Sequence, residues 1–250
     1  MIDALRAVAW RTWTITWRRP VLLTFSLGQP LVWMLFFGFL FHRFPVGEGI
    51  GYLDFLAPGV SVMTVLFGAS QSGIGWIRDL HTGFLPRMLG TPAPPSAILA
   101  GKVLADAARL LLQSAAVLLL ALLLGARLHP DPAALAAGLV CLALFALAFS
   151  CLSAAFALQV RAQEAMATFV HLVNMPLLFT STALVPRRQM PAWLAAVSRF
   201  NPLTLTVDAW RGALLRGEMP ALRSLLLLAA LAAALFLLAL TRMRAAAGRY

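Results

Sequence analysis

The sequence predicts an all-α integral membrane protein with six transmembrane helices, an N-terminal amphipathic interfacial helix and a re-entrant helix pair between spans five and six. Three observations lead to this fold class. Hydrophobic residues make up 61% of the 250 residues and charged residues only 12%, about half of the roughly 25% typical of soluble domains. The apolar residues gather in runs long enough to cross a bilayer. Most basic residues, which give a net charge of +11, flank these runs.

Residues 1–20 are predicted to form a helix that lies on the membrane surface. Its aromatic and polar stripes occupy different helical faces, with Trp10, Trp13 and Trp17 on one and Arg11, Thr14 and Arg18 on another. Indole rings favour the headgroup region and arginine favours anionic lipid, which places the helix at the cytoplasmic interface. A positively charged flank that only fixes the topology is the alternative.

Six apolar runs are long enough for transmembrane helices, because a hydrocarbon core about 30 Å thick needs about 20 residues. They cover residues 21–41, 55–77, 97–128, 133–160, 165–185 and 222–241. The longest stretch between them, 186–221, is too short for a soluble domain. We therefore expect residues 1–250 to form a single transmembrane domain.

The basic residues predict that both termini are cytoplasmic, because lysine and arginine are enriched in short cytoplasmic loops. The N-terminal arm, the second and fourth loops and the C-terminal tail carry most of them, whereas the first and third loops hold only Arg43 and Arg127. One segment opposes this assignment. Residues 186–223 hold six arginines and must lie outside if six spans are correct.

The second cytoplasmic loop, 78–96, combines charged residues, bulky apolar residues and closing prolines. Phe84, Leu85, Met88 and Leu89 lie close together in it. Apolar side chains in a short cytoplasmic loop indicate a surface that meets a partner protein. A loop that folds back onto the membrane fits the same residues.

The external segment 186–221 is predicted to form two short re-entrant helices, at 191–200 and 202–215. Asn201 followed by Pro202 is typical of a helix start, with Asn as the N-cap and Pro at the first helical position. A full span here would bury several charges at a cost on the order of 10 kcal/mol. An ordinary amphipathic external loop is the alternative. The second helix carries an apolar face made of Leu203, Val207, Trp210 and Leu214.

Polar residues inside the predicted spans could line a transport pathway or form hydrogen bonds between helices. The candidates are Gln71, Gln113, His171 and Asn174. Four residues of the third span, Lys102, Asp106, Arg109 and Gln113, share one helical face. The simpler interpretation is a protruding helix with ion pairs along its surface, and the alternative is a polar wall at a cytoplasmic entrance.

Catalytic and cofactor-binding motifs do not occur in this sequence. Lys102 lacks the upstream glycine and the Ser or Thr of a phosphate-binding loop, and Cys and His residues do not pair at metal-ligand spacing. Cys141 and Cys151, ten residues apart in one run, cannot form a disulfide with each other. We therefore expect neither an enzyme nor a metal site, and the scattered basic residues argue against nucleic-acid binding.

Several stretches resemble the sequence patterns of ABC-2 type transporter permeases. They occur in order along nearly the whole chain, at 52–59 (YLDFLAPG), 83–92 (GFLPRMLGTP), 98–103 (ILAGKV), 184–186, 190–193, 201–204, 207–209 and Arg211. Within this family the sequence looks most similar to the drug-resistance and lipo-oligosaccharide exporters. Pro86 departs from the pattern, because such loops usually carry a polar helix former there. It implies that a helix in this loop is short or begins at that residue.

The resemblance implies the membrane subunit of an ABC exporter in the bacterial cytoplasmic (inner) membrane, with two copies of the permease and two separate ATP-binding subunits. ATP and Mg²⁺ would bind to the partner subunits, and the substrate would be an amphiphilic drug, lipid or lipid-linked glycan. A secondary transporter or a membrane scaffold without an ATPase is the alternative, although the sequence shows no internal repeat. The expected ATPase-coupling residues are Asp79, Gly83, Phe84, Arg87, Met88 and Leu89. The expected re-entrant segment includes Pro186, Pro191, Trp193, Asn201, Pro202, Asp208 and Arg211.

Overall fold

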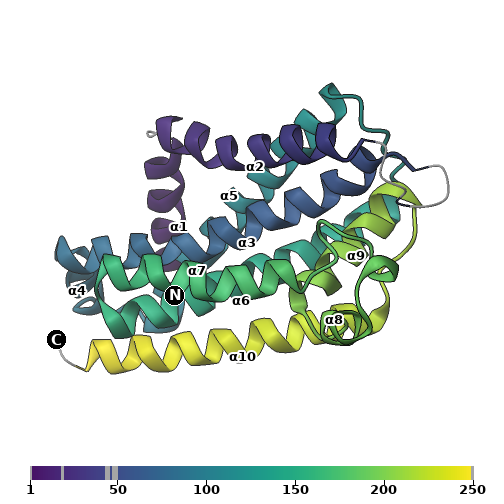
Figure 1. Ribbon diagram of the computed structural model, residues 1–250. Coiled ribbons are helices and arrows are strands. Elements are labelled where there is room, and N and C mark those ends of the chain that lie inside the picture. The colour runs from purple at the N-terminus through teal and green to yellow at the C-terminus, as the bar shows by residue number, and fades with distance from the viewer. Residues whose placement is uncertain (1, 18–19, 43–45, 47–49, 249–250) are drawn as a thin grey trace.

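The computed structural model describes residues 2–17, 20–42, 46 and 50–248, and each regular element among them is a helix (Figure 1). In chain order the elements are α1 (Ile2–Trp17), α2 (Pro20–Leu40), α3 (Tyr52–His81), α4 (Phe84–Leu89), α5 (Pro95–Leu123), α6 (Pro132–Val160), α7 (Gln163–Phe179), η1 (Arg187–Gln189), α8 (Ala192–Ser198), α9 (Pro202–Leu215) and α10 (Leu222–Ala247).

Four described helices, α3, α5, α6 and α10, are long and apolar enough to cross a membrane. They contain 26 to 30 residues each, or about 40 Å at about 1.5 Å per residue. Because this exceeds the thickness of a hydrocarbon core, their ends can project from it. The shorter helices α2 and α7 pack against α3. The structure is consistent with an all-helical integral membrane protein.

Helices α3 and α6 form the centre of the bundle. In α3, 78% of the most apolar stretch is buried, and α6 packs against α3, α9 and α10. Glycines allow these helices to approach closely. A Cβ atom at Gly73 would lie 2.7 Å from the hydroxyl of Ser153, and one at Gly138 would lie 2.8 Å from the ring of Trp210. The α9 helix is thereby held against the centre of the bundle.

The outward faces of the peripheral helices are apolar. In α10 only 17% of the most apolar stretch is buried, and Leu222, Leu226 and Leu237 are exposed. In α2, Phe36 and Phe39 are exposed as well. Such surfaces are typical of helices that contact lipid tails. The backbone polar groups are bonded within the helix, so that only apolar side chains meet the lipid.

The fifth predicted span, 165–185, differs from the structure. Helix α7 ends at Phe179, after 17 residues, and residues 180–186 are not helical. Pro176 lies in the last turn of α7. The helix alone is about 25 Å long, which is shorter than a hydrocarbon core. The non-helical residues 180–186 therefore take the place of the last turns of the helix that was predicted here.

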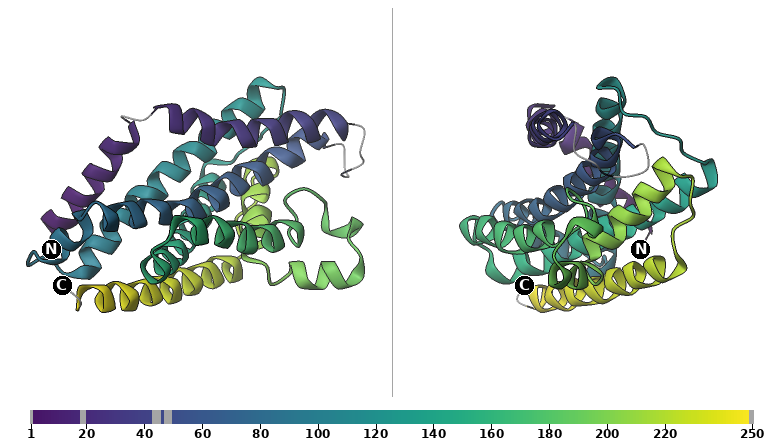
Figure 2. Two further views of the ribbon diagram at one scale, coloured as in Figure 1. Left: turned by 60° about the vertical axis from the view of Figure 1, so that its left-hand side comes forward. Right: turned by 45° about the vertical axis from the view of Figure 1, so that its right-hand side comes forward.

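The N-terminal segment is helical from Ile2 to Trp17. Trp10 is 72% exposed, whereas the side chains of Trp13 and Trp17, and all of Arg18 and Arg43, lie outside the described residues. The start of α1 and the end of α10 lie at the end of the bundle that carries α4 (Figure 2, left). We call this the α4 end and the opposite one the α9 end.

Candidate functional site

At the α4 end, α3 reverses into α4 through a tight turn. Gly83 adopts a left-handed conformation, with φ of 69°, that glycine tolerates without strain. Arg87 reaches back over this turn, and its guanidinium donates to the carbonyl oxygens of Gly83 at 3.0 Å and Thr82 at 3.2 Å. Pro86 lies inside α4, which is only six residues long, as expected of a short helix. Arg87 thus stabilises the turn that positions α4.

Asp79, near the end of α3, is shared between cations from two other helices. Its side chain is only 7% exposed. One carboxylate oxygen accepts from Arg11 of α1 at 3.0 Å, and the other accepts from the ammonium of Lys102 in α5 at 2.5 Å. Charges of this kind can be buried because each satisfies the other. Asp79 joins α1, α3 and α5 at one point.

Aromatic rings cover both cations of this cluster. The guanidinium carbon of Arg11 lies 3.5 Å from the ring centroid of Phe84, and the Lys102 ammonium lies 4.2 Å from that of Trp76. Both distances suit cation–π contacts. Because Phe84 is the first residue of α4, Arg11 links α1 to α4 as well as to α3.

The structure leaves the expected coupling residues unequally accessible. Asp79 is buried, and Phe84 lies against Arg11. Met88 and Leu89 are half-buried against the protein's own core. Exposed residues lie on both sides of α4, namely His81 and Thr82 before it and Arg87, Gly90, Thr91 and Pro92 in its last turn and just after it. The turns that flank α4 are therefore its most accessible parts.

The polar face of α5 is enclosed rather than solvated. Lys102, Asp106 and Gln113 are buried, and Arg109 is half-buried. Arg109 donates to the side-chain oxygen of Gln113 at 3.1 Å and lies 3.8 Å from one oxygen of Asp106. The other Asp106 oxygen has no hydrogen-bond partner among the described residues. The interpretation of this face as surface ion pairs on a protruding helix does not fit such burial.

At the α9 end, Asn201 caps α9 and ties it to α7. Its side-chain oxygen accepts from the backbone N–H of Leu203 at 2.8 Å. Its amide nitrogen donates to the carbonyl of Leu177 at 2.7 Å and to the hydroxyl of Thr180 at 2.8 Å. The helix start predicted at Asn201 and Pro202 is confirmed. The predicted apolar face of this helix is buried at each of its positions, Leu203, Val207, Trp210 and Leu214.

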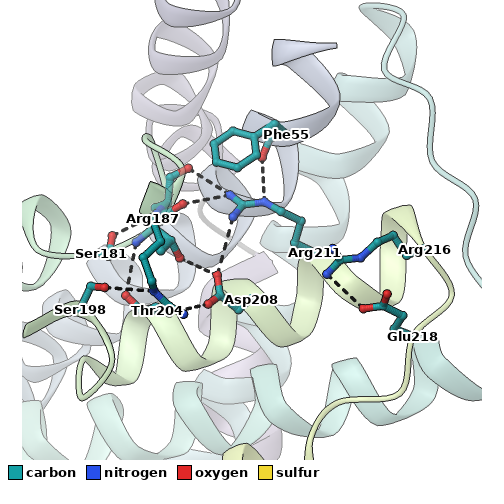
Figure 3. Close-up of polar contacts among 11 residues, drawn as sticks. Phe55, Ser181, Arg187, Ser198, Thr204, Asp208, Arg211, Arg216 and Glu218 are labelled. Atoms are coloured by element: carbon teal, nitrogen blue, oxygen red, sulfur yellow. Dashed lines mark hydrogen bonds and ion pairs between the residues drawn. The ribbon is translucent and has the colours of Figure 1, made fainter. Parts of the chain in front are cut away.

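Arg211 of α9 donates hydrogen bonds to backbone carbonyls of the non-helical segment 180–186 (Figure 3). Its guanidinium donates to the carbonyls of Thr182 at 3.1 Å and Ala183 at 3.4 Å, and to that of Phe55 in α3 at 3.2 Å. Non-helical backbone at membrane depth is tolerated only where protein groups bind its polar atoms.

Asp208 connects Arg211 to the segment before α8. One carboxylate oxygen accepts from the hydroxyl of Thr182 at 2.6 Å, and the other accepts from Arg187 at 2.8 Å. Arg211 lies 3.8 Å from the first oxygen. Figure 3 shows Arg187 and Arg211 approaching Asp208 from two sides. The expected residues Arg211 and Asp208 therefore form one cluster with two residues that the sequence did not single out, Thr182 and Arg187.

The segment 180–186 also lies directly against α3. A Cβ atom at Gly59 would overlap the carbonyl oxygen of Ala183, so only glycine fits there without a shift of the backbone. The hydroxyl of Tyr52 donates to the carbonyl of Leu184 at 3.1 Å. These contacts involve two residues of the YLDFLAPG stretch, which the sequence alone did not connect to this segment.

The candidate pathway residues differ in their surroundings. Asn174 is buried and accepts from the hydroxyl of Ser70 at 2.8 Å, so it joins α7 to α3. Gln71 and His171 are exposed on the outside of the chain, and Gln113 belongs to the enclosed face of α5. Two of the four residues are therefore buried among helices and two are exposed.

The remaining residues of the expected re-entrant segment differ in their surroundings. Pro191 is the N-cap residue of α8, whereas Pro186 is buried. Trp193, on α8, is 68% exposed. An exposed indole at the edge of an apolar bundle suits the headgroup region of a membrane.

Arg11 and Lys102 hold more of the fold together than the sequence indicates. The sequence places Arg11 on a stripe that faces anionic lipid and Lys102 on a solvated face. The sequence feature that could have indicated this pairing is a charged side chain close to an apolar run, because such residues usually pair inside the bundle. Their common partner, Asp79, is 68 residues from Arg11 along the chain, which no local pattern could reveal.

A metal site is not supported by the described part of the chain, where no group of three or more His, Cys, Asp or Glu side chains could hold an ion. Cys141 and Cys151 are free and buried. The two charge clusters, at Asp79 and at Asp208, each hold several segments together, and we take them as the candidate functional sites.

Comparison with known proteins matches residues 3–215 to the model of the ABC-2 type transporter family. The sequence is 31% identical over 216 residues to ycf38 of Pyropia yezoensis, which is named as a transport permease, covering 84% of this chain and 74% of that protein. It is 33% identical over 198 residues to ycf38 of Cyanophora paradoxa, covering 78% and 68%. It is 29% identical over 210 residues to the daunorubicin resistance ABC transporter permease protein DrrB1 of Streptomyces coeruleorubidus, covering 84% and 74%.

Proposed function

The chain belongs to the ABC-2 type transporter family, and on that premise we propose that it is the membrane-spanning permease subunit of an ATP-driven ABC exporter. A second copy of the chain completes the translocation path, and two separate ATP-binding subunits carry ATP and Mg²⁺. The location that we propose is the bacterial cytoplasmic membrane.

The proposed topology has six spans, α2, α3, α5, α6, α7 and α10, with both termini and α4 on the cytoplasmic side. Two observations support it. The start of α1 and the end of α10 both lie at the α4 end (Figure 2), as an even number of spans requires. At the α9 end, Arg187 and Arg211 pair with Asp208, and Arg216 pairs with Glu218. These arginines are paired within the protein and are not isolated charges in contact with lipid tails.

The observation that carries the proposal is the position of α4. This short helix connects α3 and α5, two of the helices able to cross a membrane. The contact between Phe84 and Arg11 joins α4 to α1, and Asp79 of α3 pairs with both Arg11 and Lys102 of α5, so α4 is linked to the same charge cluster as the two spans. A partner that moves α4 therefore moves the ends of two spans. Energy from ATP hydrolysis in another subunit can enter the membrane by this route.

The proposed substrate is an amphiphile, namely a drug, a lipid or a lipid-linked glycan. The name of DrrB1 associates that protein with resistance to daunorubicin. In the chain described here, the outer faces of α2 and α10 are apolar, and polar residues such as Gln71 and His171 lie exposed among the proposed spans. Such a mixture suits a substrate with both an apolar and a polar part.

The test is the binding of the ATPase subunit to the turn after α4. Thr91→Trp places a bulky ring on the exposed side of this turn, where we expect the partner to lie, and should abolish co-purification of the ATPase. His129→Trp is the matched control, because His129 is also exposed but lies in the loop between α5 and α6 at the α9 end. Normal co-purification and export by the Thr91→Trp variant would contradict the assignment.

Met88→Asp gives a second test within α4 itself. Met88 is half-buried and packs in part against the protein's own core, so a carboxylate at this position is costly there as well as in an apolar contact with a partner. Phe84→Asp is a poorer probe, because the new carboxylate would lie beside Arg11 and could pair with it. We expect Met88→Asp to insert into the membrane but to lose ATPase-dependent export.

A further inference from the structure

We propose that Arg11 is a positioning residue that locks the N-terminal helix α1 and the short helix α4 to the ends of α3 and α5, so that these four elements move as one unit. This inference rests on the proposed function for its consequence in transport. Its structural content, a rigid contact between α1 and α4, stands independently of that function.

Arg11 makes two different contacts through the edge and the plane of its guanidinium group. The edge faces Asp79, with one nitrogen 3.0 Å from one carboxylate oxygen and the other nitrogen 3.5 Å from the second oxygen. The plane covers Phe84, with the central carbon 3.5 Å from the ring centroid. Only a planar group with several donors can form a forked ion pair and stack on a ring simultaneously.

The fold does not need Arg11 to bury the Asp79 charge. Asp79 keeps the ammonium of Lys102 at 2.5 Å, and the side chain of Lys102 is 8% exposed. The side chain of Arg11 itself is 32% exposed. Because Lys102 alone can compensate the carboxylate, Arg11 is an additional partner. Its distinctive contribution is the link to Phe84, and therefore to α4.

Helix α1 is also attached to α5, and this attachment does not depend on Arg11. It packs along α5, so loss of Arg11 should leave α1 beside the bundle. The contact that connects α1 to the start of α4 would be lost. Movement imposed on α4 would then reach α3, from which α4 continues, but would no longer be shared with α1.

The first test measures the distance between α1 and α4 in the full chain. Nitroxide labels at Ala7→Cys and Thr91→Cys, in a background without Cys141 and Cys151, report this distance by pulsed EPR. We expect a narrow distribution with Arg11 and a broad one in Arg11→Met. Arg11→Lys should be intermediate, because lysine keeps a single charge contact but cannot form the fork. Equal distributions in all three proteins would overturn the proposal.

The second test measures coupling in the reconstituted permease–ATPase complex. Arg11→Met should keep ATPase binding but lower the amount exported per ATP hydrolysed about tenfold, the population change expected for one lost charge-assisted hydrogen bond. Arg6→Met is the matched control, because Arg6 is exposed on the same helix. An equal fall in Arg6→Met would show that the charge of α1 acts through lipid, and an unchanged ratio in Arg11→Met would equally overturn the proposal.

The two tests also separate this inference from the proposed function. If no ATPase binds even the unaltered chain, the proposed function fails, whereas the EPR result on the permease alone still decides whether Arg11 fixes α1 to α4. If the ATPase binds but neither the distance nor the coupling ratio responds to Arg11, only the present inference fails.

Discussion

Replacement of Arg211 by methionine should be among the most destabilising single changes in this protein. The guanidinium donates to the backbone carbonyls of Phe55, Thr182 and Ala183, and its side chain is only 12% exposed. Methionine keeps an apolar side chain beside Phe55 but leaves these acceptors without their donor. The non-helical segment 180–186 would thereby lose the group that holds it against α3 and α9.

The magnitude follows from these contacts. A buried acceptor left unsatisfied costs about 1 to 3 kcal/mol. Two such acceptors are affected, the carbonyls of Thr182 and Ala183, because the Phe55 carbonyl lies within α3 and keeps the bonding of that helix. The contact at 3.4 Å is long and the side chain of Asp208 is 42% exposed, so we take the lower half of this range. The expected loss is about 2 to 4 kcal/mol, or on the order of 10 °C in the midpoint of thermal unfolding.

Arg216→Met is the matched control on the same segment. Arg216 pairs with Glu218 at 3.0 Å, but both side chains are more than half exposed, and exposed pairs contribute at most about 1 kcal/mol. Both variants would be heated in detergent at one fixed rate, because an irreversible transition has a midpoint that depends on the scan rate. If the midpoints of Arg211→Met and Arg216→Met agree within about 2 °C, the reasoning about the 180–186 backbone is wrong.

Packing, topology and assembly each give a further prediction. Gly59→Ala should strongly reduce the yield of folded protein, because its Cβ would overlap the Ala183 carbonyl, whereas Gly75→Ala on the same helix should be tolerated, since the nearest contact would be 3.7 Å away. Cysteines at Gln189 and Thr91 should react with an impermeant thiol reagent from opposite sides of the membrane, and labelling from one side would contradict the six-span topology. Two differently tagged copies should co-purify, and a 1:1 permease–ATPase complex that still exports would rule out the dimer.

Local signals in the sequence predicted local structure well. Asn201 and Pro202 lie next to each other and together form a helix start, so the beginning of α9 could be predicted directly. Proline at position 86 likewise implied that a helix in this loop is short or begins at that residue, and α4 has only six residues. These features depend on neighbouring residues, which is why a single sequence was sufficient.

The end of α7 could not be predicted in this way. The run 165–185 is largely apolar, and hydropathy does not distinguish a helix from a buried irregular segment. After Phe179 the backbone leaves the helix, and Arg211 and Thr204 supply hydrogen-bond partners that the helix would have provided. These partners lie more than twenty residues further along the chain, beyond any window used to identify a span.

The residues of the Asp79 cluster illustrate the same limit for function. The sequence indicated the loop that carries α4 as a contact surface with Phe84 among its coupling residues, but it did not reveal that Arg11 lies over this ring. The partner of each charge lies on another helix, and the pairing depends on how α1 and α5 pack. The sequence shows which residues of this cluster are charged, but it does not show which of them form ion pairs with each other.

The two ends of the bundle use the same physical arrangement. Asp79 binds Arg11 and Lys102 at the α4 end, and Asp208 binds Arg187 and Arg211 at the α9 end. In each case one carboxylate compensates two cations from different segments, which leaves one unit of positive charge near the proposed membrane surface. Such a cluster can hold helices together without placing an unpaired charge among the lipid tails.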